Sequence, residues 1–241
     1  MDALAARVRR AGGEPLVTWY RPESGGRTEL SGRTLANWVD KTANLLDTLG
    51  VEEWVASPLS VAHPGHWMSL IWPLAAWQHG CGYRAGAPDA LSELVVVGPD
   101  SPAAHPAWLT IACSLHPLGL GLRNLPDGVL DFTGEALAEP DVHLAVPVPP
   151  EATAWVDGDQ TVSHAAAGDV QPVPGRVLVR PTTAWETLAA TLLGPVLGGG
   201  SAVVVEGEVS DAELARIAAS ERVSAAWQHG AARGRTESEN R

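Results

Sequence analysis

Apolar residues recur along the chain in two patterns, short runs of strand length and longer stretches with helical spacing. Residues 32–49 carry apolar side chains along one helix face, with Ser31 placed as the N-cap and Gly50 as the C-cap. The same spacing predicts helices at 63–82, 131–138, 183–200 and 210–224, and a short helix start at 161–168. Pro73 should kink the helix at 63–82 or mark its start. Strands are expected at 15–20, 53–60, 93–99, 108–115, 153–156, 175–181 and 201–207.

The alternation of helices with near-continuous apolar strands predicts an α/β fold with mostly parallel sheets flanked by helices. Glycine and proline are dense at 117–150, which indicates a connection between two units. We therefore expect two layered subdomains, at 1–116 and 151–228. Residues 229–241 are polar and are expected to form a disordered tail.

Composition and charge narrow the classes of partner. The net charge of −12 over 241 residues argues against nucleic acid and anionic membranes, because both reward clustered Lys and Arg. No apolar run is long enough to span a membrane, and the first residues lack the apolar core of a secretory signal. Cys81 and Cys113 lie among apolar neighbours and are interpreted as reduced core thiols. These features favour a cytoplasmic protein.

The stretch AWVDGDQTVSHAAA, residues 154–167, bears most directly on function. Its pattern predicts a strand, a turn and a helix start, an arrangement that holds phosphate groups in many folds. The turn, however, carries Asp157 and Asp159, and Lys41 is the only lysine of the chain. Two carboxylates repel a triphosphate unless a metal ion bridges them. The pattern therefore favours an acidic hairpin over a phosphate site.

Three blocks resemble AMP-forming acyl-CoA synthetases and adenylation domains. They are LSGRTLANWVDKTANLLDTLGV (30–51), MSLIWPLAAWQHGCGYRAG (68–86) and the segment from RVLVRP to SERVS (176–224), and their order is similar to the N-terminal part of those enzymes. The chain also looks like a short actinobacterial family of AMP-binding-like proteins, since its Arg- and Ala-rich, Lys-poor composition is typical of a high-GC genome. The resemblance implies the core fold of an adenylate-forming enzyme in a shortened form.

The resemblance also implies chemistry that this chain does not carry. In the enzymes a loop rich in Ser, Thr and Gly, ending in Lys-Gly, holds the ATP phosphates, whereas WVDGDQT (155–161) stands at that place here. The enzymes' adenine- and ribose-binding motifs would follow the region that matches 175–226, and their catalytic lysine has no counterpart after Lys41. The acidic residue that anchors an amino-acid substrate in adenylation domains would fall near residues 181–185, PTTAW.

No residue is therefore assigned a catalytic role. Five residues are candidates to line a residual ligand cleft: Trp155, Asp157, His164, Thr183 and Trp185. Neither a metal site nor a cofactor is expected, and ATP with Mg²⁺ would bind only if the chain were an enzyme.

Two other groups of residues could suggest a metal site and a nucleophilic triad. The histidines at 63, 66 and 79 lack an acidic or cysteine partner at zinc spacing apart from Cys81, so they are interpreted as helix-end or surface residues. Ser163 and His164 lie near Asp157 without a G-x-S-x-G elbow, so His164 is interpreted as a helix-capping residue that bonds to backbone.

The tryptophans are mostly expected to pack in the interior. Trp38, Trp72, Trp77 and Trp185 fall on apolar helix faces, although such side chains could also line a pocket or a dimer surface.

Three functions from different classes follow. The leading hypothesis is a degenerate, non-catalytic relative of the ligases that binds a partner protein or a small apolar carboxylic acid. The second is an acyl- or aryl-acid-activating AMP-forming ligase completed by a partner chain that carries the missing lysine domain. The third is a structural homodimer that associates through exposed tryptophans.

Overall fold

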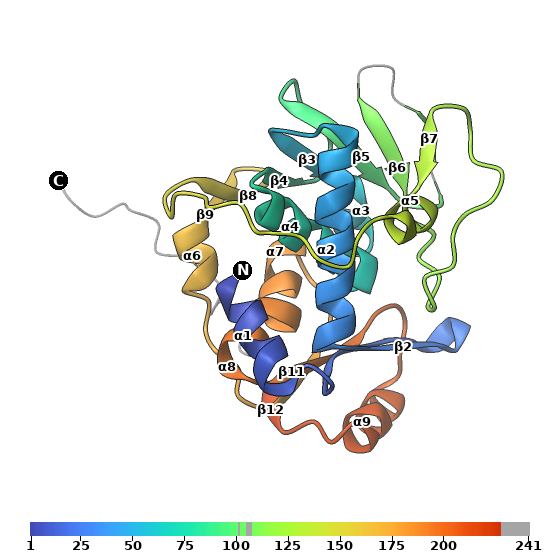
Figure 1. Cartoon of the computed structure of the whole chain (residues 1–241). Coiled ribbons are helices and arrows are strands. Elements are labelled where there is room, and N and C mark those ends of the chain that lie inside the picture. The colour runs from blue at the N-terminus through green and yellow to red at the C-terminus, as the bar shows by residue number, and fades with distance from the viewer. Residues whose placement is uncertain (101, 105–107, 228–241) are drawn as a thin grey trace.

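The computed structural model describes residues 1–100, 102–104 and 108–227, and the tail expected at 229–241 lies outside this range. The described chain forms two β-sheets with helices around and between them (Figure 1). The α/β fold class with mostly parallel strands is thereby confirmed, because the β1–β2 and β8–β9 pairs are the antiparallel ones among the described strands.

The five-stranded sheet has the order β12-β10-β11-β1-β2. Its strands come from the two ends of the chain: β1 (Pro15–Arg21), β2 (Gly26–Ser31), β10 (Arg176–Val179), β11 (Ser201–Val205) and β12 (Ala225–Ala226). β1 pairs in parallel with β11, so Val17 lies opposite Ala202 and Tyr20 opposite Val205.

The seven-stranded sheet has the order β7-β6-β5-β3-β4-β8-β9. Its strands are β3 (Trp54–Ser57), β4 (Gly82–Ala85), β5 (Ser92–Val97), β6 (Leu109–Ala112), β7 (Val129–Asp131), β8 (Thr153–Asp157) and β9 (Gln160–Ser163).

The sheets do not follow the division expected at residues 117–150. The five-stranded sheet combines strands from both expected subdomains, and β8 and β9 extend the seven-stranded sheet instead of belonging to a second unit. The reason is long-range strand pairing. β1 pairs with β11 although about 185 residues separate the two strands in sequence. A local sequence pattern carries no information on such pairing.

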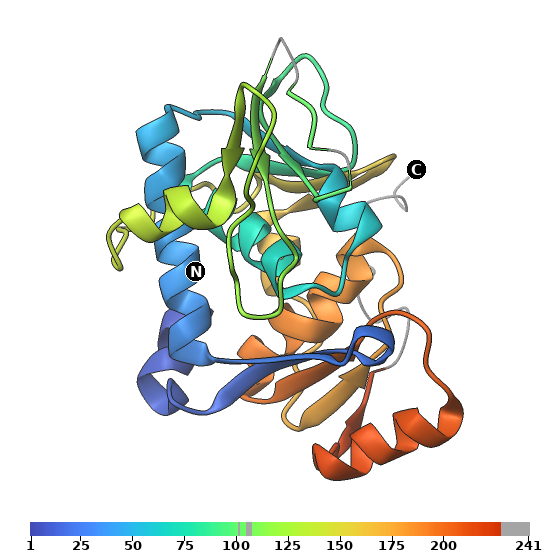
Figure 2. The ribbon, with the colours of Figure 1, turned by 90° about the vertical axis from the view of Figure 1, so that its right-hand side faces the viewer.

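The helices of the described chain connect and cover these sheets. They are α1 (Asp2–Ala11), the 3₁₀ turn η1 (Pro22–Ser24), α2 (Gly32–Leu49), α3 (Pro58–Ala62), α4 (Trp67–His79), α5 (Phe132–Ala138), α6 (His164–Gly168), α7 (Ala184–Leu188), the π-helical η2 (Ala189–Leu193), α8 (Gly194–Gly198) and α9 (Asp211–Ser220). Figure 2 shows the two sheets one above the other, with α2 reaching from one to the other and α9 below the five-stranded sheet. The single helix expected at 183–200 is thus α7, η2 and α8 in succession.

Local signals account well for α2 and α4. The Ser31 hydroxyl accepts a hydrogen bond from Thr34 N–H, and Gly50 ends α2 with φ +68°, as expected for both caps. α4 continues through Pro73, which cannot donate to the carbonyl of Ser69. The Ser60 hydroxyl lies 3.5 Å from that carbonyl oxygen and donates to it, so the acceptor keeps a partner.

Alternation along the strands separates two hydrophobic clusters. The larger one fills the space between the sheets, and a smaller one joins Val203, Val205 and Ile217 where α9 covers the outer face of the five-stranded sheet. Ala202 and Val204 of β11 face the large cluster while Val203 and Val205 face the small one, as the two-residue period of a strand requires.

The structure bears on the expectations about membrane-spanning segments and about the two cysteines. Within the described residues no helix is both long and apolar enough to cross a bilayer. Cys81 and Cys113 are buried and unpaired, as expected, and burial raises the pKa of each thiol to about 12.

Candidate functional site

The segment expected to show whether a phosphate site exists forms a tight hairpin. β8 runs to Asp157, which pairs with Gln160 of β9, so Gly158 and Asp159 alone make the turn. Gly158 has φ +54°, a conformation that glycine adopts without steric cost. The expected helix start at 161–168 is therefore partly a strand: β9 comes first and α6 begins only at His164.

The hairpin presents carboxylates where β8 ends. Asp159 is exposed and Asp157 is half-buried, and burial raises the pKa of Asp157 above its ordinary value. β8 pairs in parallel with β4, so Asp157 lies opposite Ala85 at the carboxyl ends of both strands. In open α/β sheets this edge is where ligands usually bind. An anionic ligand there would meet these two carboxylates.

Trp155 and Trp185 come together with Tyr83 in the interior. The ring centroids of Trp155 and Trp185 lie 5.5 Å apart, and those of Trp155 and Tyr83 5.1 Å apart. All three are at most 2 % exposed, and Tyr83 Oη shares a 2.5 Å hydrogen bond with Ser60. Neither tryptophan lines either of the cavities described below. The three rings form a packed aromatic core, which contributes to stability and leaves a ligand no access to them.

Thr183 is the N-cap of α7. Its hydroxyl accepts a hydrogen bond from the backbone N–H of Glu186 at 3.2 Å, and its side chain otherwise faces solvent. Thr183 is two residues from Trp185 in sequence, but its hydroxyl caps α7.

Residues 63–66 pack tightly against the carboxyl edge of the five-stranded sheet. A Cβ on Gly65 would lie 2.5 Å from Cγ of Pro181 and 2.9 Å from Cγ1 of Val204, so only glycine fits between β11 and the second residue after β10. His66 is the N-cap of α4, with its ring edge-to-face on Trp19 at 4.7 Å. Burial lowers the pKa of His66 to about 3, so the ring is neutral at pH 7.

The histidines considered as metal ligands do not converge. His66 is buried and caps a helix, His63 lies 3.9 Å from Asp100, and His79 lies 3.1 Å from Asp47. Asp47 also lies 3.0 Å from Nε2 of His143, which sequence reasoning did not consider. Among the residues that the structure describes, no group of three or more His, Cys, Asp or Glu side chains is placed to hold a metal ion.

His164 lies apart from the other four candidates. Ser163 caps α6, so the capping role considered for His164 belongs to its neighbour, while the backbone N–H of His164 donates to the carbonyl of Ala152. The imidazole packs edge-to-face on Trp77 with centroids 6.0 Å apart. Burial, and then the positive charge of the chain's amino terminus, lower the pKa of His164.

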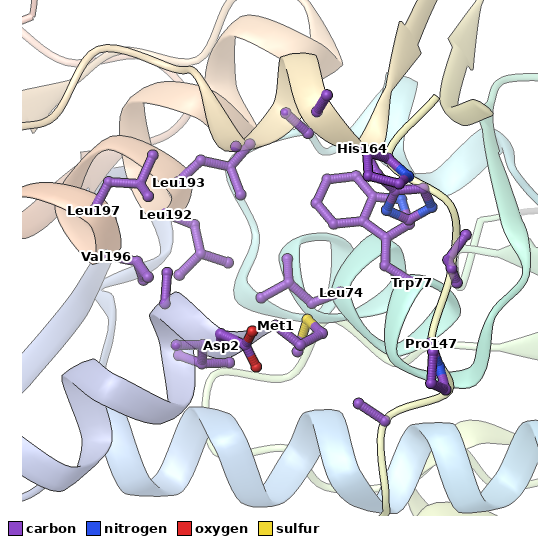
Figure 3. A pocket seen from close by; sticks show the side chains of 18 of the residues that line it. Met1, Asp2, Leu74, Trp77, Pro147, His164, Leu192, Leu193, Val196 and Leu197 are labelled. Atoms are coloured by element: carbon purple, nitrogen blue, oxygen red, sulfur yellow. The ribbon is translucent and has the colours of Figure 1, made fainter. Parts of the chain in front are cut away.

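His164 and Trp77 line the wall of an apolar cavity of about 530 Å³ (Figure 3). The other walls come from α1, from residues 145–150 and from the end of η2 with α8. Their lining residues are Met1, Asp2, Ala3, Leu4, Leu74, Ala145, Val146, Pro147, Val148, Pro150, Ala165, Ala167, Gly168, Leu192, Leu193, Val196 and Leu197. We call this space the amino-edge cavity.

The topology fixes where the amino-edge cavity lies. α4 follows β3 and returns to the start of β4, so its last turns, with Leu74 and Trp77, lie at the amino ends of those strands. The helix from α7 to α8 returns in the same way from the end of β10 to the start of β11. The cavity is therefore on the side of the sheets opposite to Asp157. Sequence reasoning missed it, because its walls come from five separate segments.

A strap formed by residues 139–150 lies over α2 and closes one side of the cavity. Asn44 of α2 donates to the carbonyl of Val142 at 3.1 Å, and the backbone N–H of Val146 donates to the carbonyl of Gln78 at 2.8 Å. These bonds, together with the His143–Asp47 contact, hold the extended strap in place.

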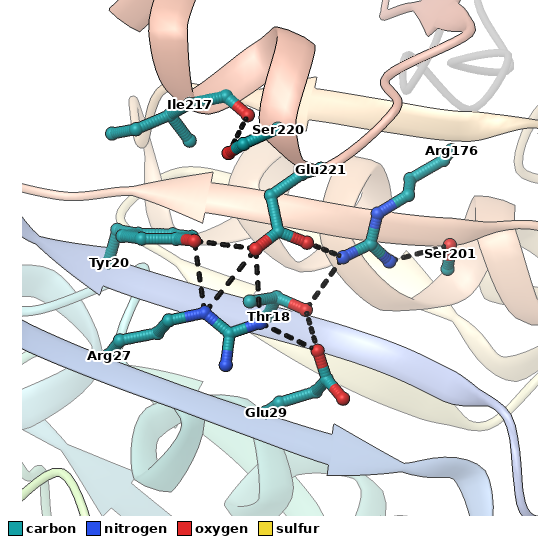
Figure 4. A network of polar contacts seen from close by, with 9 residues as sticks. All are labelled: Thr18, Tyr20, Arg27, Glu29, Arg176, Ser201, Ile217, Ser220 and Glu221. Carbon is teal, nitrogen blue, oxygen red and sulfur yellow. Dashed lines mark hydrogen bonds and ion pairs between the residues drawn. The ribbon is translucent and has the colours of Figure 1, made fainter. Parts of the chain in front are cut away.

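A polar network holds the end of α9 on the five-stranded sheet (Figure 4). The Glu221 carboxylate accepts hydrogen bonds from Tyr20 at 2.5 Å, Arg27 at 3.0 Å and Arg176 at 2.5 Å. Burial alone would raise the pKa of Glu221, but these donors outweigh it and lower the pKa. An open cavity of about 570 Å³ beside the network is lined by three arginines and three glutamates, so its fixed charges balance: Arg7, Arg176, Arg222, Glu14, Glu29 and Glu221.

The tryptophans do not form an adhesive surface. Each of the ten is buried or partly buried, and six are at most 7 % exposed. The exposed tryptophans that would support a structural homodimer are absent from the described chain.

Comparison with solved structures identifies the fold. An acyl-CoA synthetase from Brucella canis matches with a TM-score of 0.72 and 17 % identity, over 93 % of this chain and 46 % of its own. The fold of this chain is therefore similar to about half of that synthetase. An amide bond synthetase from Marinactinospora thermotolerans matches with a TM-score of 0.64 and 21 % identity, over 92 % of this chain and 47 % of its own. This chain therefore spans about half the length of the solved structures it matches, and the expected resemblance is confirmed at the level of the fold.

Sequence comparison adds one relative of similar length. A TIGR03089 family protein from Mycobacterium tuberculosis is 28 % identical over 223 residues, which cover 87 % of this chain and 90 % of that protein. No family model matches the chain.

Proposed function

We propose that this chain is a non-catalytic relative of AMP-forming acyl-CoA synthetases and adenylation domains, and that it acts in the cytoplasm by binding a partner protein or a small apolar ligand. The proposal needs neither ATP nor Mg²⁺. The observation that carries it is the two-residue turn between Asp157 and Gln160 at the end of β8.

A triphosphate requires several hydrogen-bond donors and a balancing positive charge. Phosphate groups are held by several backbone N–H groups in a glycine-rich loop, usually with a lysine or a metal ion to balance their charge. The hairpin offers one glycine and two carboxylates, and the only lysine of the chain, Lys41, forms an ion pair with Asp141 of the strap at 2.9 Å. The buried and unpaired Cys81 and Cys113 support a reducing compartment.

Calorimetric titration of the full chain with ATP and Mg²⁺ tests the proposal. We expect no binding heat up to about millimolar nucleotide, which corresponds to less than roughly 4 kcal/mol of binding free energy. Dissociation constants in the micromolar range would overturn it. The variant Asp157→Asn, Asp159→Asn serves as control: removing both carboxylates alone should not create a site, because the glycine-rich loop is still missing.

A second candidate function is favoured by one observation, the match to only 46–47 % of each solved enzyme chain. A partner chain could supply the rest of an acyl- or aryl-acid-activating AMP-forming ligase. Pyrophosphate release from ATP with a panel of carboxylic acids, measured with and without the products of neighbouring genes, tests this function. Release that depends on both chains would support it, and silence in every combination would remove it.

A further inference from the structure

The amino-edge cavity has the size and shape of a ligand site. Its volume of about 530 Å³ lies within the usual range for small-molecule pockets, roughly 300–1,000 Å³. Five segments surround it, and Leu74, Leu192 and Trp77 lie in its walls almost fully buried. A space of this size with apolar walls gains free energy when an apolar molecule replaces the water that it would otherwise hold.

The cavity has one polar group suited to orient a ligand. The imidazole of His164 projects beside Trp77 into the space (Figure 3), and no described residue forms a hydrogen bond with its ring nitrogens. A neutral imidazole can both donate and accept, so it can bind a hydroxyl, carbonyl or amide group of a ligand.

The charges around the cavity select against an anion. Asp2 places a carboxylate in the wall, and none of the lining residues is a lysine or an arginine. Burial lowers the pKa of His164 below its ordinary 6.5, which favours the neutral ring at pH 7. A carboxylate ligand would thus lose its hydration without gaining a lysine or arginine partner.

We propose that the amino-edge cavity binds an uncharged, largely apolar molecule with a single hydrogen-bonding group, which His164 holds at the Trp77 wall. The inference names a ligand class for the proposed function, and it rests on that function only in assuming that the chain acts by binding. The site is separate from the carboxyl edge, where an enzyme of this fold class would be expected to hold its ligands.

The test uses fluorescence of the uncharged dye N-phenyl-naphthylamine with the full chain at pH 7.5. We expect saturable binding, competition by 1-decanol, and competition by decanoate that is weaker by about tenfold or more, equivalent to about 1.4 kcal/mol. Absence of dye binding would overturn the site. Equal competition by the alcohol and the acid would overturn the assignment to uncharged ligands.

Matched variants locate the binding. Ala165 is an exposed residue of α6 that lines the cavity, so Ala165→Trp should fill the space and weaken dye binding at least about tenfold. Ala212→Trp places the same side chain on the exposed surface of α9 and should leave binding unchanged. Equal affinity of the two variants would place the dye elsewhere. If Ala165→Trp does not fold by circular dichroism, Leu197→Trp replaces it on another wall.

The tests of this inference and of the proposed function fail separately. Nucleotide binding in the calorimeter contradicts the loss of ATP chemistry and leaves the dye result intact. Lack of dye binding contradicts the cavity's role whatever the calorimeter shows.

Discussion

Around the carboxyl end of β8 this molecule is packed with aromatic rings and ends in a tight hairpin, whereas at the amino ends of the parallel strands it encloses an apolar cavity. The rings of Tyr83 and Trp185 pack against Trp155, two residues before Asp157, while the segments around His164 leave about 530 Å³ between them. Open α/β sheets usually bind ligands at the carboxyl edge. In this molecule the apolar cavity lies at the opposite edge.

The largest expected effect is on the free energy of unfolding, which a substitution in the aromatic core should lower more than one in the cavity wall. Trp155→Ala should lower the free energy of unfolding by about 3–5 kcal/mol, because it removes a fully buried ring from a filled core. Leu193→Ala should cost only about 1 kcal/mol, because Leu193 already borders empty space. Urea unfolding followed by circular dichroism measures both. Equal losses would mean that the two edges are packed alike.

The charged network around Glu221 should matter nearly as much. Glu221→Gln should cost about 1.5–3 kcal/mol, since it weakens charge-assisted hydrogen bonds from Arg27 and Arg176. Glu213→Gln on the exposed face of α9 is the matched control and should leave the urea midpoint nearly unchanged.

The Glu221 effect should also depend on pH. The folded state lowers the pKa of Glu221 below its ordinary 4.5, so the carboxylate's contribution is complete above that value and is lost as the pH falls through the folded-state pKa. The difference between wild type and Glu221→Gln should therefore shrink in acid. A difference that is constant from pH 7 to pH 3 would contradict the role of the charge.

His66 gives the packed edge a pH dependence of its own. The folded state holds the ring neutral with a pKa of about 3, whereas the unfolded chain takes up a proton near the ordinary 6.5. Stability is complete above pH 6.5 and falls as the pH decreases toward 3, by about 2 kcal/mol at pH 5.

His66→Asn removes this titration and keeps a side-chain acceptor for the Met68 N–H at the start of α4. Unfolding curves at pH 7.5 and pH 5 should show a smaller drop for the variant than for wild type. Parallel drops would show that His66 does not cause the acid sensitivity.

The hairpin turn should contribute less than the aromatic core or the charged network. Gly158→Ala should cost about 1–2 kcal/mol, because alanine is disfavoured at φ +54°. Gly13→Ala, at a position with open space and no positive φ, should be close to neutral. A Gly158→Ala protein as stable as wild type would mean that the turn is not the tight one described.

Sequence reasoning predicted what depends on near neighbours. The caps at Ser31 and Gly50, the strand at β1, the helix at α5 and the two unpaired cysteines all follow from a few adjacent residues. The acidic turn after Asp157 was likewise predicted from Asp-Gly-Asp, but the strand β9 that follows it was expected to be a helix start.

The rest depends on distant pairing. β1 joins β11 across nearly the whole chain, which a local pattern does not reveal, so the division into subdomains at 1–116 and 151–228 differs from the observed sheets. Of the five cleft candidates, Trp155 and Trp185 are brought together in the core, Thr183 caps α7, and His164 lines a cavity that no motif indicates. The cavity lies between segments that are far apart in sequence, so no single segment predicts it.

Hydrogen exchange of the full chain, followed by mass spectrometry, tests the central contrast in one measurement. The account predicts that N-phenyl-naphthylamine slows exchange in residues 145–150 and 164–168, and that ATP with Mg²⁺ leaves residues 153–163 unchanged. Protection of the β8–β9 hairpin by ATP with Mg²⁺, without any effect of the dye at the amino edge, would contradict it.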